Sequence, residues 1–307
     1  MEYETWSDRQ ESTTVPVDEH ELEVAYYDEG SGDPLVFLHG IPTSSFLWRA
    51  VAPELTAEYR VIVPDMVGYG NSAMHDGFDR SIRAQEVMID GLLDELNLES
   101  VSCVGHDLGG GVGLRYAVHE PGSVSKLVLS NAVCYDSWPI ERIVDLGLPA
   151  TIEDMSVDEL QKLLREIYQQ TLYGEDPSDE FIDGMIAQWD SEEARVSLSR
   201  NAIGTNTSHT TEIDPTEITA ETLLLWGSED AFQPIEYAER LKDDISNADL
   251  VGLDEANHWV PEDRPETYLE RRSGRTRRSE PLGSRRSSGD LSRPPRSVSR
   301  GVSIVLA

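Results

Sequence analysis

Positions 104–110 read Val-Gly-His-Asp-Leu-Gly-Gly, and this heptapeptide is the most informative stretch of the chain. It follows an apolar run typical of a buried strand and precedes a helical pattern. This stretch matches the motif Gly-x-nucleophile-x-Gly, which is typical of a sharp strand-to-helix turn that exposes a nucleophile. Asp107 occupies the nucleophile position, next to a helix N-terminus whose partial positive charge stabilises an anion. Alternatively, Asp107 is an ordinary N-cap residue of that helix.

Around this turn, short β-rich runs alternate with helical patterns. Such alternation predicts an α/β fold in which helices flank a mostly parallel central sheet. The expected strands span 21–27, 35–38, 61–64, 101–104, 126–130, 222–226 and 250–253. The expected helices between them span 81–96, 109–119 and 235–242, with a further helix near 47–55.

The strand pattern stops after Asn131 and returns at Leu223. Helical patterns at 157–170, 179–189 and 192–203 fill the interval, as expected of a helical cap inserted into the fold. We therefore divide the chain into a first core part (1–133), a helical cap (134–217), a second core part (218–270) and a tail (271–307).

The order of three polar residues along the chain extends the pattern. Asp230 follows the strand expected at 222–226, and His258 follows the strand expected at 250–253. Nucleophile, acid and histidine in this order form the catalytic triad of one class of α/β enzymes. We therefore predict that Asp107 is the nucleophile, that His258 is the general base and that Asp230 orients His258. His39 and His106 are interpreted as residues that brace neighbouring loops.

These motifs resemble the α/β-hydrolase superfamily, in particular the aspartate-nucleophile branch that contains haloalkane dehalogenases and epoxide hydrolases. The resemblance covers about residues 35–264, and the segment 39–49, His-Gly-Ile-Pro-Thr-Ser-Ser-Phe-Leu-Trp-Arg, is similar to the dehalogenase version of its loop. The resemblance implies that the helical insertion covers the active site. It also implies an oxyanion hole formed by the backbone N–H groups of Ile41 and Leu108.

An aspartate nucleophile restricts the chemistry. Attack by Asp107 on a saturated carbon gives an ester, which water can cleave, whereas attack on a carboxylic ester would give an anhydride. The expected activity is hydrolysis at an alkyl carbon of a small apolar substrate, with His258 activating the water. This mechanism requires neither a metal nor an organic cofactor.

The residues expected near the leaving group differ from those of the dehalogenases. Dehalogenases of this branch hold halide with a tryptophan after the nucleophile or an asparagine in the His-Gly-x-Pro loop, and Leu108 and Ile41 occupy those positions here. This difference slightly favours an epoxide, whose opening needs an acid. Candidate acids in the cap are Tyr135, Tyr168 and Tyr173, and each could instead be a packing residue. The polar segment 200–209 either faces the substrate or caps helices and turns.

Two alternative functions remain open, because a fold does not determine a function. One is an enzyme of the same fold with other chemistry, such as C–C bond hydrolysis or a lyase reaction, in which Asp107 is not alkylated. The other is a ligand-binding protein without turnover.

The charge of the chain is extreme, at −33. Residues 1–270 contain 15 basic and 56 acidic residues, a net charge of −41, and the whole chain has three lysines. Acidic residues spread along the whole sequence, together with few lysines, are typical of proteins from salt-accumulating halophiles. It also disfavours nucleic acid and anionic membranes as partners. With no apolar run long enough to cross a membrane and no signal-like N-terminus, we expect a cytoplasmic protein.

The tail differs abruptly from the body, with ten arginines and two acidic residues between 271 and 307. Its composition predicts disorder. The tail is either a basic arm or a non-native, frame-shifted or inert end. We favour the second interpretation, and therefore expect truncation after Glu270 to change stability little.

Overall fold

The computed structural model describes residues 1–149, 154–174, 177–204 and 206–269. Its centre is an eight-stranded sheet with the order β1-β2-β4-β3-β5-β6-β7-β8. Only β2 runs antiparallel to its neighbours, and the other strands run in one direction. The strands are β1 (Gln10–Val17), β2 (His20–Gly30), β3 (Asp33–Leu38), β4 (Tyr59–Pro64), β5 (Val101–His106), β6 (Val124–Ser130), β7 (Glu221–Gly227) and β8 (Ala248–Leu253).

All seven predicted strands are present, and the mostly parallel α/β sheet is confirmed. The strand that the sequence analysis missed is β1 at the edge of the sheet. Its sequence is mainly polar, and only Val15 and Val17 are buried. An edge strand with one solvated face carries too few apolar residues to be recognised by its pattern, and Pro16 is tolerated there.

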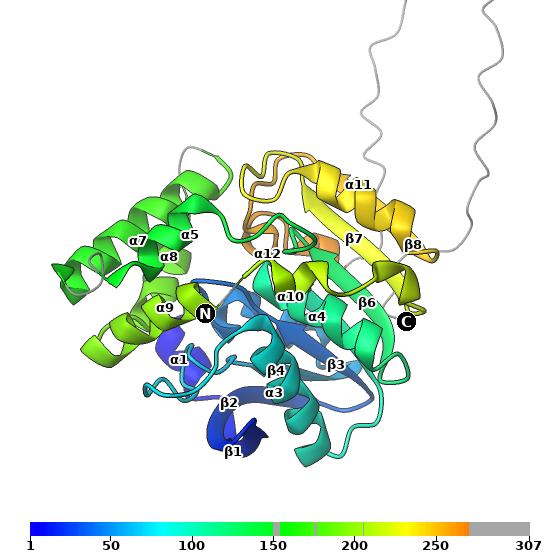
Figure 1. Cartoon of the computed structure of the whole chain (residues 1–307), viewed down its shortest axis with the longest axis horizontal. Helices are drawn as coiled ribbons and strands as arrows, with labels where there is room; N and C mark the ends of the chain where they lie inside the picture. Colours follow the sequence, from blue (N-terminus) through cyan, green and yellow to red (C-terminus); the bar gives the residue numbers. More distant parts are fainter. Residues whose placement is uncertain (150–153, 175–176, 205, 270–307) are drawn as a thin grey trace, which may run out of the picture.

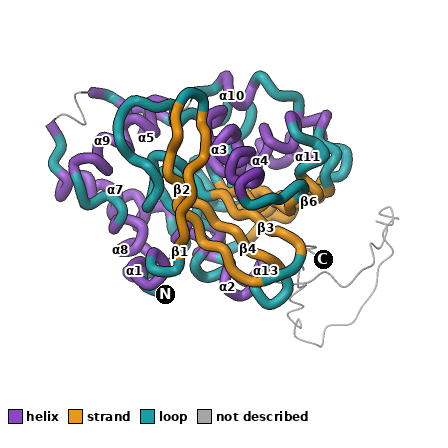
Figure 2. Tube along the Cα trace, turned by 90° about the horizontal axis from the view of Figure 1, so that it is seen from below, coloured by secondary structure: helices purple, strands orange, loops and turns teal. Residues whose placement is uncertain are grey.

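Helices cover both faces of the sheet (Figures 1 and 2). One face carries the three long predicted helices α3, α4 and α11, while α2 and α13 lie against the other (Figure 2). Their bounds, with the short helices near them, are α1 (Tyr3–Ser7), η1 (Ser45–Trp48), α2 (Ala52–Leu55), α3 (Ile82–Glu95), α4 (Leu108–His119), α11 (Ile235–Asp244), α12 (Val260–Asp263) and α13 (Glu266–Leu269). The helix expected near 47–55 is thus two short helices, η1 and α2.

Between β6 and β7 the described residues form helices and no strand. Figure 1 shows α5, α7, α8 and α9 gathered beside the sheet as a separate group. This group contacts the core through buried side chains such as Trp189, whose indole N–H donates to the carbonyl of Pro42 at 2.9 Å. The helices are α5 (Glu141–Gly147), α7 (Val157–Thr171), α8 (Asp179–Ala187), α9 (Glu192–Gly204), α10 (Ser208–Thr211) and η2 (Pro215–Glu217).

The sequence around Ser156 explains why α7 begins there. Ser156 and Glu159 form a capping box, in which each side chain pairs with the backbone N–H of the other. This arrangement satisfies two N–H groups that a helix end otherwise leaves unpaired. Leu160, Leu164 and Ile167 then recur at helical spacing and are buried against neighbouring helices.

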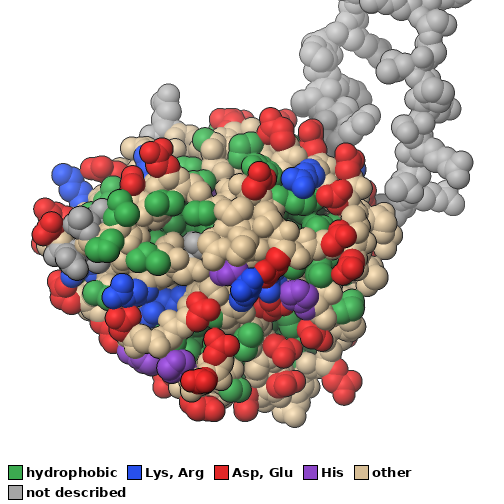
Figure 3. All heavy atoms as spheres, viewed as in Figure 1, with side chains coloured by type: hydrophobic (Ala, Val, Ile, Leu, Met, Phe, Trp, Pro, Cys, Tyr) green, Lys and Arg blue, Asp and Glu red, His purple; other side chains and the backbone are tan. Residues whose placement is uncertain are grey.

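Acidic side chains are scattered over the face seen in Figure 3 and do not gather in one patch. This even spread agrees with the diffuse acid of the sequence. No helix in the described part of the chain has both the length and the apolar character that crossing a membrane requires. The predicted tail, 271–307, lies outside the described residues.

Candidate active site

The turn between β5 and α4 is sharply bent at Asp107. Its backbone has φ 52° and ψ −120°, in a region that non-glycine residues rarely adopt. The turn also approaches β3 so closely that a Cβ atom on Gly109 would lie 2.4 Å from the carbonyl oxygen of Leu38. Glycine is therefore required there. Asp107 occupies the N-cap position of α4, but its side chain does not make the hydrogen bond of an ordinary N-cap residue.

The carboxylate of Asp107 is buried and held by backbone donors. Its Oδ1 accepts a hydrogen bond from the N–H of Ile41 at 2.9 Å. Burial raises the pKa of Asp107, while His258 and the N–H groups of Ile41 and Leu108 act in the opposite direction. The two backbone donors selected from the sequence thus act on one carboxylate, and Oδ2 is left facing the histidine.

His258 lies between two carboxylates. Its Nδ1 is 2.8 Å from Oδ2 of Asp230, and its Nε2 is 3.7 Å from Oδ2 of Asp107. Burial alone would lower the pKa of His258, but the two carboxylates outweigh it and raise the pKa above the usual histidine value. Burial likewise would raise the pKa of Asp230, yet His258 and hydrogen bonds lower it. The structure therefore brings Asp107, Asp230 and His258 together.

Asn131 is a member of this cluster that the sequence analysis did not select. Its side-chain N–H donates to Oδ2 of Asp230, and its Oδ1 accepts from the N–H of Gly227 at 3.1 Å. Asp230 Oδ1 accepts from the N–H of Phe232 at 2.7 Å. Asn131 immediately follows β6, so its position at the C-terminal edge of the sheet is the signal that could have identified it.

The loop that carries His258 is also fixed from its other side by Asp263. The two carboxylate oxygens accept from the backbone N–H groups of Asn257 at 2.9 Å and Tyr173 at 3.0 Å. Burial raises the pKa of Asp263 to about 6. In addition, the indole of Trp259 donates to the hydroxyl of Thr171 at 2.7 Å. These contacts join the histidine loop to the end of α7.

A small cavity opens onto Asp107 and His258. The space open to the centre of a water molecule is about 20 Å³, enough for roughly one water. Most of its wall is apolar. The lining residues are Ile41, Pro42, Asp107, Trp138, Ile140, Arg142, Ile143, Leu146, Ile167, Phe232, His258 and Trp259.

Two residues of the wall carry polar groups that were not predicted. Trp138 is 2% exposed, and its indole N–H has no hydrogen-bond partner. Arg142, on α5, is exposed at the surface, and its Nη1 lies 3.4 Å from Oε1 of Gln170. Both lie between β6 and α7, where no motif marks them, so only the fold reveals their place in the cavity.

The three tyrosines suggested as acids do not line this cavity. The hydroxyl of Tyr135 donates to Asp244 at 2.6 Å, away from Asp107. The hydroxyl of Tyr168 donates to the carbonyl of Pro42 at 3.1 Å. Tyr173 is 39% exposed. The structure therefore does not bring Tyr135, Tyr168 or Tyr173 into the wall of this cavity, where an acid was expected.

The polar segment 200–209 also serves the fold in its described part. Asn201 donates to the carbonyl of Gly68 at 2.8 Å, and Thr207 donates to the carbonyl of Trp138 at 2.6 Å. None of its described residues lines the cavity. Of the two interpretations of this segment, the structure supports the capping of helices and turns. His39 likewise joins two loops, as predicted, because its Nε2 accepts from the N–H of Met66 at 3.0 Å.

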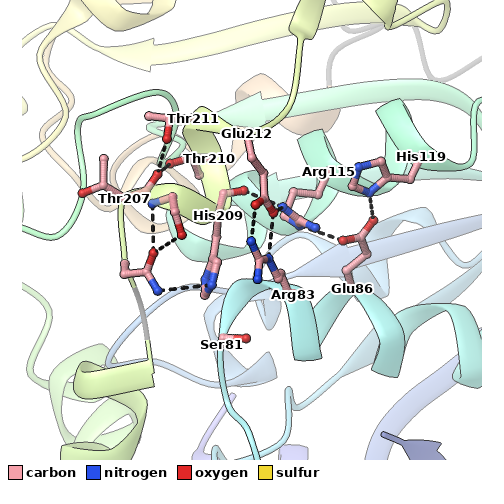
Figure 4. Close-up of polar contacts among 12 residues, drawn as sticks. Ser81, Arg83, Glu86, Arg115, His119, Thr207, His209, Thr210, Thr211 and Glu212 are labelled. Atoms are coloured by element: carbon pink, nitrogen blue, oxygen red, sulfur yellow. Dashed lines mark hydrogen bonds and ion pairs between the residues drawn. The ribbon is translucent and has the colours of Figure 1, made fainter.

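Figure 4 shows a second polar cluster, where the end of α10 meets α3 and α4. The carboxylate of Glu212 pairs with Arg83 and Arg115, and Arg115 also pairs with Glu86 at 2.7 Å. His119 lies 2.6 Å from the other oxygen of Glu86. All of these partners satisfy one another, so the cluster fastens the C-terminal end of the helical insertion to the core.

Comparisons with known proteins place this geometry in a family. The sequence profile of the alpha/beta hydrolase fold family matches residues 33–155. A 2-hydroxy-6-oxo-2,4-heptadienoate hydrolase of Pseudomonas putida is 30% identical over 246 residues, covering 78% of this chain and 87% of that protein. Haloalkane dehalogenase 2 of Mycobacterium tuberculosis is 28% identical over 256 residues, covering 79% and 87%.

A solved structure gives the same result. The crystal structure of an alpha/beta hydrolase fold protein from Burkholderia ambifaria superposes with a TM-score of 0.74 at 26% identity. The superposition covers 83% of this chain and 97% of the Burkholderia ambifaria protein. The sheet, the turn at Asp107 and these relatives agree, and the chain therefore belongs to the alpha/beta hydrolase fold family.

Proposed function

We propose that the protein hydrolyses a bond at a saturated carbon through a covalent ester on Asp107. One observation carries this proposal: the two oxygens of Asp107 have different surroundings. Oδ1 accepts from the N–H of Ile41, whereas Oδ2 lies 3.7 Å from Nε2 of His258, and Asp107 lines the cavity. One oxygen is thus held as the future ester carbonyl, and the other is available to attack.

In the first step, Oδ2 of Asp107 attacks the carbon of the substrate. A carbon–oxygen bond forms, and the bond to the leaving group breaks, with the electron pair departing on the leaving group. The product is an ester whose carbonyl oxygen is Oδ1. Attack by the same carboxylate on a carboxylic ester would give an anhydride, which argues against an acyl-transfer reaction.

In the second step, Nε2 of His258 takes a proton from water, and the water oxygen attacks Cγ of Asp107. Negative charge develops on Oδ1, next to the N–H groups of Ile41 and Leu108. Collapse of this intermediate releases the alcohol, which receives the proton from His258. Asp230 stabilises the imidazolium and keeps Nδ1 protonated.

The leaving group is best explained as a halide. The indole N–H of Trp138 is buried in the cavity wall without a partner, and a buried donor without a partner costs about 1–3 kcal/mol. An indole can donate a hydrogen bond to a halide but does not give up its proton, which an epoxide oxygen would need. This reverses the preference for an epoxide that the sequence suggested.

Three further parts of the proposal concern the whole chain. The helices between 134 and 217 would act as a cap, because Trp138, Ile143 and Ile167 close the cavity over Asp107. An aspartate nucleophile would place the protein in the dehalogenase-like branch of its family. The diffuse acidic surface would adapt it to molar salt, where the Debye length is only about 3 Å.

Trapping the ester in a His258→Gln variant tests the proposal. This variant should form the ester but not hydrolyse it. After incubation with bromoalkanes or epoxides in molar KCl, mass spectrometry measures the mass of the intact protein and of the peptide that contains Asp107. An added alkyl group with loss of bromine means dehalogenation, and an added whole epoxide means epoxide hydrolysis.

An Asp107→Ala/His258→Gln double variant is the matched control, and it should gain no mass from any compound. Absence of an adduct on the single variant, with the fold intact by circular dichroism, would contradict alkylation of Asp107. That result would favour C–C hydrolysis, a lyase reaction or ligand binding without turnover.

A further inference from the structure

We infer that the substrate carries a carboxylate at the end remote from the reacting carbon, and that Arg142 binds this carboxylate. The inference rests on the proposed function, because it names the substrate class of the same cavity. It is carried by the position of Arg142 in the wall that also contains Asp107 and His258.

The chemical layout of the cavity matches a bifunctional substrate. Asp107 and His258 are at its buried side, whereas Arg142 is at the surface of the protein. The wall between them is formed largely by apolar side chains such as Ile143 and Ile167. A molecule with an electrophilic carbon, a short apolar stretch and an anionic end would satisfy all three parts.

Arg142 has no ion pair among the described residues, and its contact with Gln170 is weak. It lies in the first turn of α5 (Glu141–Gly147), where the helix dipole disfavours a positive charge. Its contact with Gln170, at 3.4 Å, is longer than a charge-assisted hydrogen bond. No carboxylate of the described residues lies within 4.0 Å of its guanidinium, not even that of Asp145 one turn further along the helix.

The other arginines of the described ranges behave differently. Ten of the twelve form ion pairs with carboxylates; these are Arg9, Arg49, Arg60, Arg83, Arg115, Arg165, Arg195, Arg200, Arg240 and Arg264. Arg80 is buried and donates to backbone carbonyls, including that of Met74 at 2.8 Å. Among these described arginines, Arg142 alone has neither kind of partner, although the chain is rich in acid.

The net charge explains why such a residue would be needed. A chain with a net charge of −33 repels an approaching anion, and Asp107 adds a negative charge inside the cavity. A guanidinium at the opening offsets this repulsion locally and offers paired N–H groups that match a carboxylate. In molar salt the long-range repulsion is screened, while direct contact with Arg142 persists.

Matched substrates test this inference with the full-length protein in molar KCl. Bromide release is measured for 6-bromohexanoate and for 6-bromohexanamide, which differ only in the charge of the terminal group. We expect wild-type kcat/KM to favour the acid by about tenfold or more, the effect of one charge-assisted hydrogen bond. Arg142→Gln should remove this preference, and Arg142→Lys should retain part of it.

The control variant is Arg165→Gln, which removes a surface arginine of α7 that pairs with Asp183. It should leave both substrates unchanged. Equal turnover of acid and amide by the wild type, or an equal loss of both in Arg142→Gln, would overturn the inference.

Binding of the unreactive compounds hexanoate and hexanamide, measured by calorimetry, separates this inference from the proposed function. In one outcome, neither bromo compound is turned over, but the wild type binds hexanoate about tenfold more tightly than hexanamide and Arg142→Gln does not. Arg142 then binds carboxylates, and the proposed reaction fails. If bromide is released but hexanoate binds no better than hexanamide, the proposed reaction stands and the inference fails.

Discussion

Oδ2 of Asp107 and Nε2 of His258 face each other at 3.7 Å, beyond hydrogen-bond distance. Oδ1 accepts from the N–H of Ile41 at 2.9 Å, so the two oxygens of this carboxylate face different groups. In the proposed mechanism, His258 would activate the water that attacks Cγ after Oδ2 has been alkylated. This separation connects the two proposed steps through a single pair of side chains.

The pKa of His258 predicts how the ester should depend on pH. Asp230 and Asp107 raise this pKa above the ordinary value of 6.5, despite burial. A protonated His258 cannot take a proton from water, so the ester should accumulate in the wild type as the pH falls through this pKa. Mass spectrometry of samples quenched at different pH values measures the fraction alkylated.

Asp230→Asn provides the comparison for this pH profile. Removing the carboxylate should lower the pKa of His258 and move accumulation of the ester to lower pH. An alkylated fraction that does not change with pH in the wild type would argue against His258 as the general base.

Trp138→Phe tests the leaving group, because phenylalanine keeps an aromatic ring but lacks the N–H. Loss of a hydrogen bond to a developing anion should slow formation of the ester about tenfold to a hundredfold. Chloride is a poorer leaving group than bromide, so 1-chlorohexane should be affected more than 1-bromohexane. Rapid-quench kinetics of halide release would measure both. Equal rates in variant and wild type would exclude this role for Trp138.

Gly40→Ala should disable the nucleophile without unfolding the protein. A Cβ atom at Gly40 would lie 2.3 Å from Oδ1 of Asp107 and 2.4 Å from its Cβ, so the carboxylate must move. A displacement of this size can reduce the rate of alkylation about a hundredfold. Gly122→Ala is the control, because a Cβ atom added there would meet no heavy atom within 4 Å. Alkylation rates and melting curves of both variants check the prediction.

Salt should stabilise the protein. The net charge of −33 produces repulsion within the folded chain, and salt screens this repulsion. We therefore expect the melting temperature to rise by several degrees between dilute buffer and molar KCl. An uncharged osmolyte at the same osmolality is the control, and it should raise the melting temperature less than KCl does. A melting temperature independent of KCl would rule out salt adaptation.

The sequence predicted those parts of the site that local patterns determine. Asp107, Asp230 and His258 each follow a strand, and parallel strands end at one edge of the sheet, so their meeting could be anticipated. Trp138 precedes α5 and Arg142 lies in its first turn, and their place in the cavity wall depends on packing between elements that are distant in the sequence. The tyrosines were chosen by residue type alone, and β1 was hidden because its outward face is polar.

The two ends of the helical insertion are attached in different ways. Its C-terminal end is fastened by Glu212 to Arg83 and Arg115 (Figure 4), whereas α5 near its N-terminal end forms the wall of a cavity with room for about one water. A substrate larger than water must therefore displace part of the cavity wall, to which α5 contributes Arg142, Ile143 and Leu146. We therefore expect amide hydrogen exchange to be faster in α5 than in α10, because helices that yield to a ligand belong to the less stable parts of a fold.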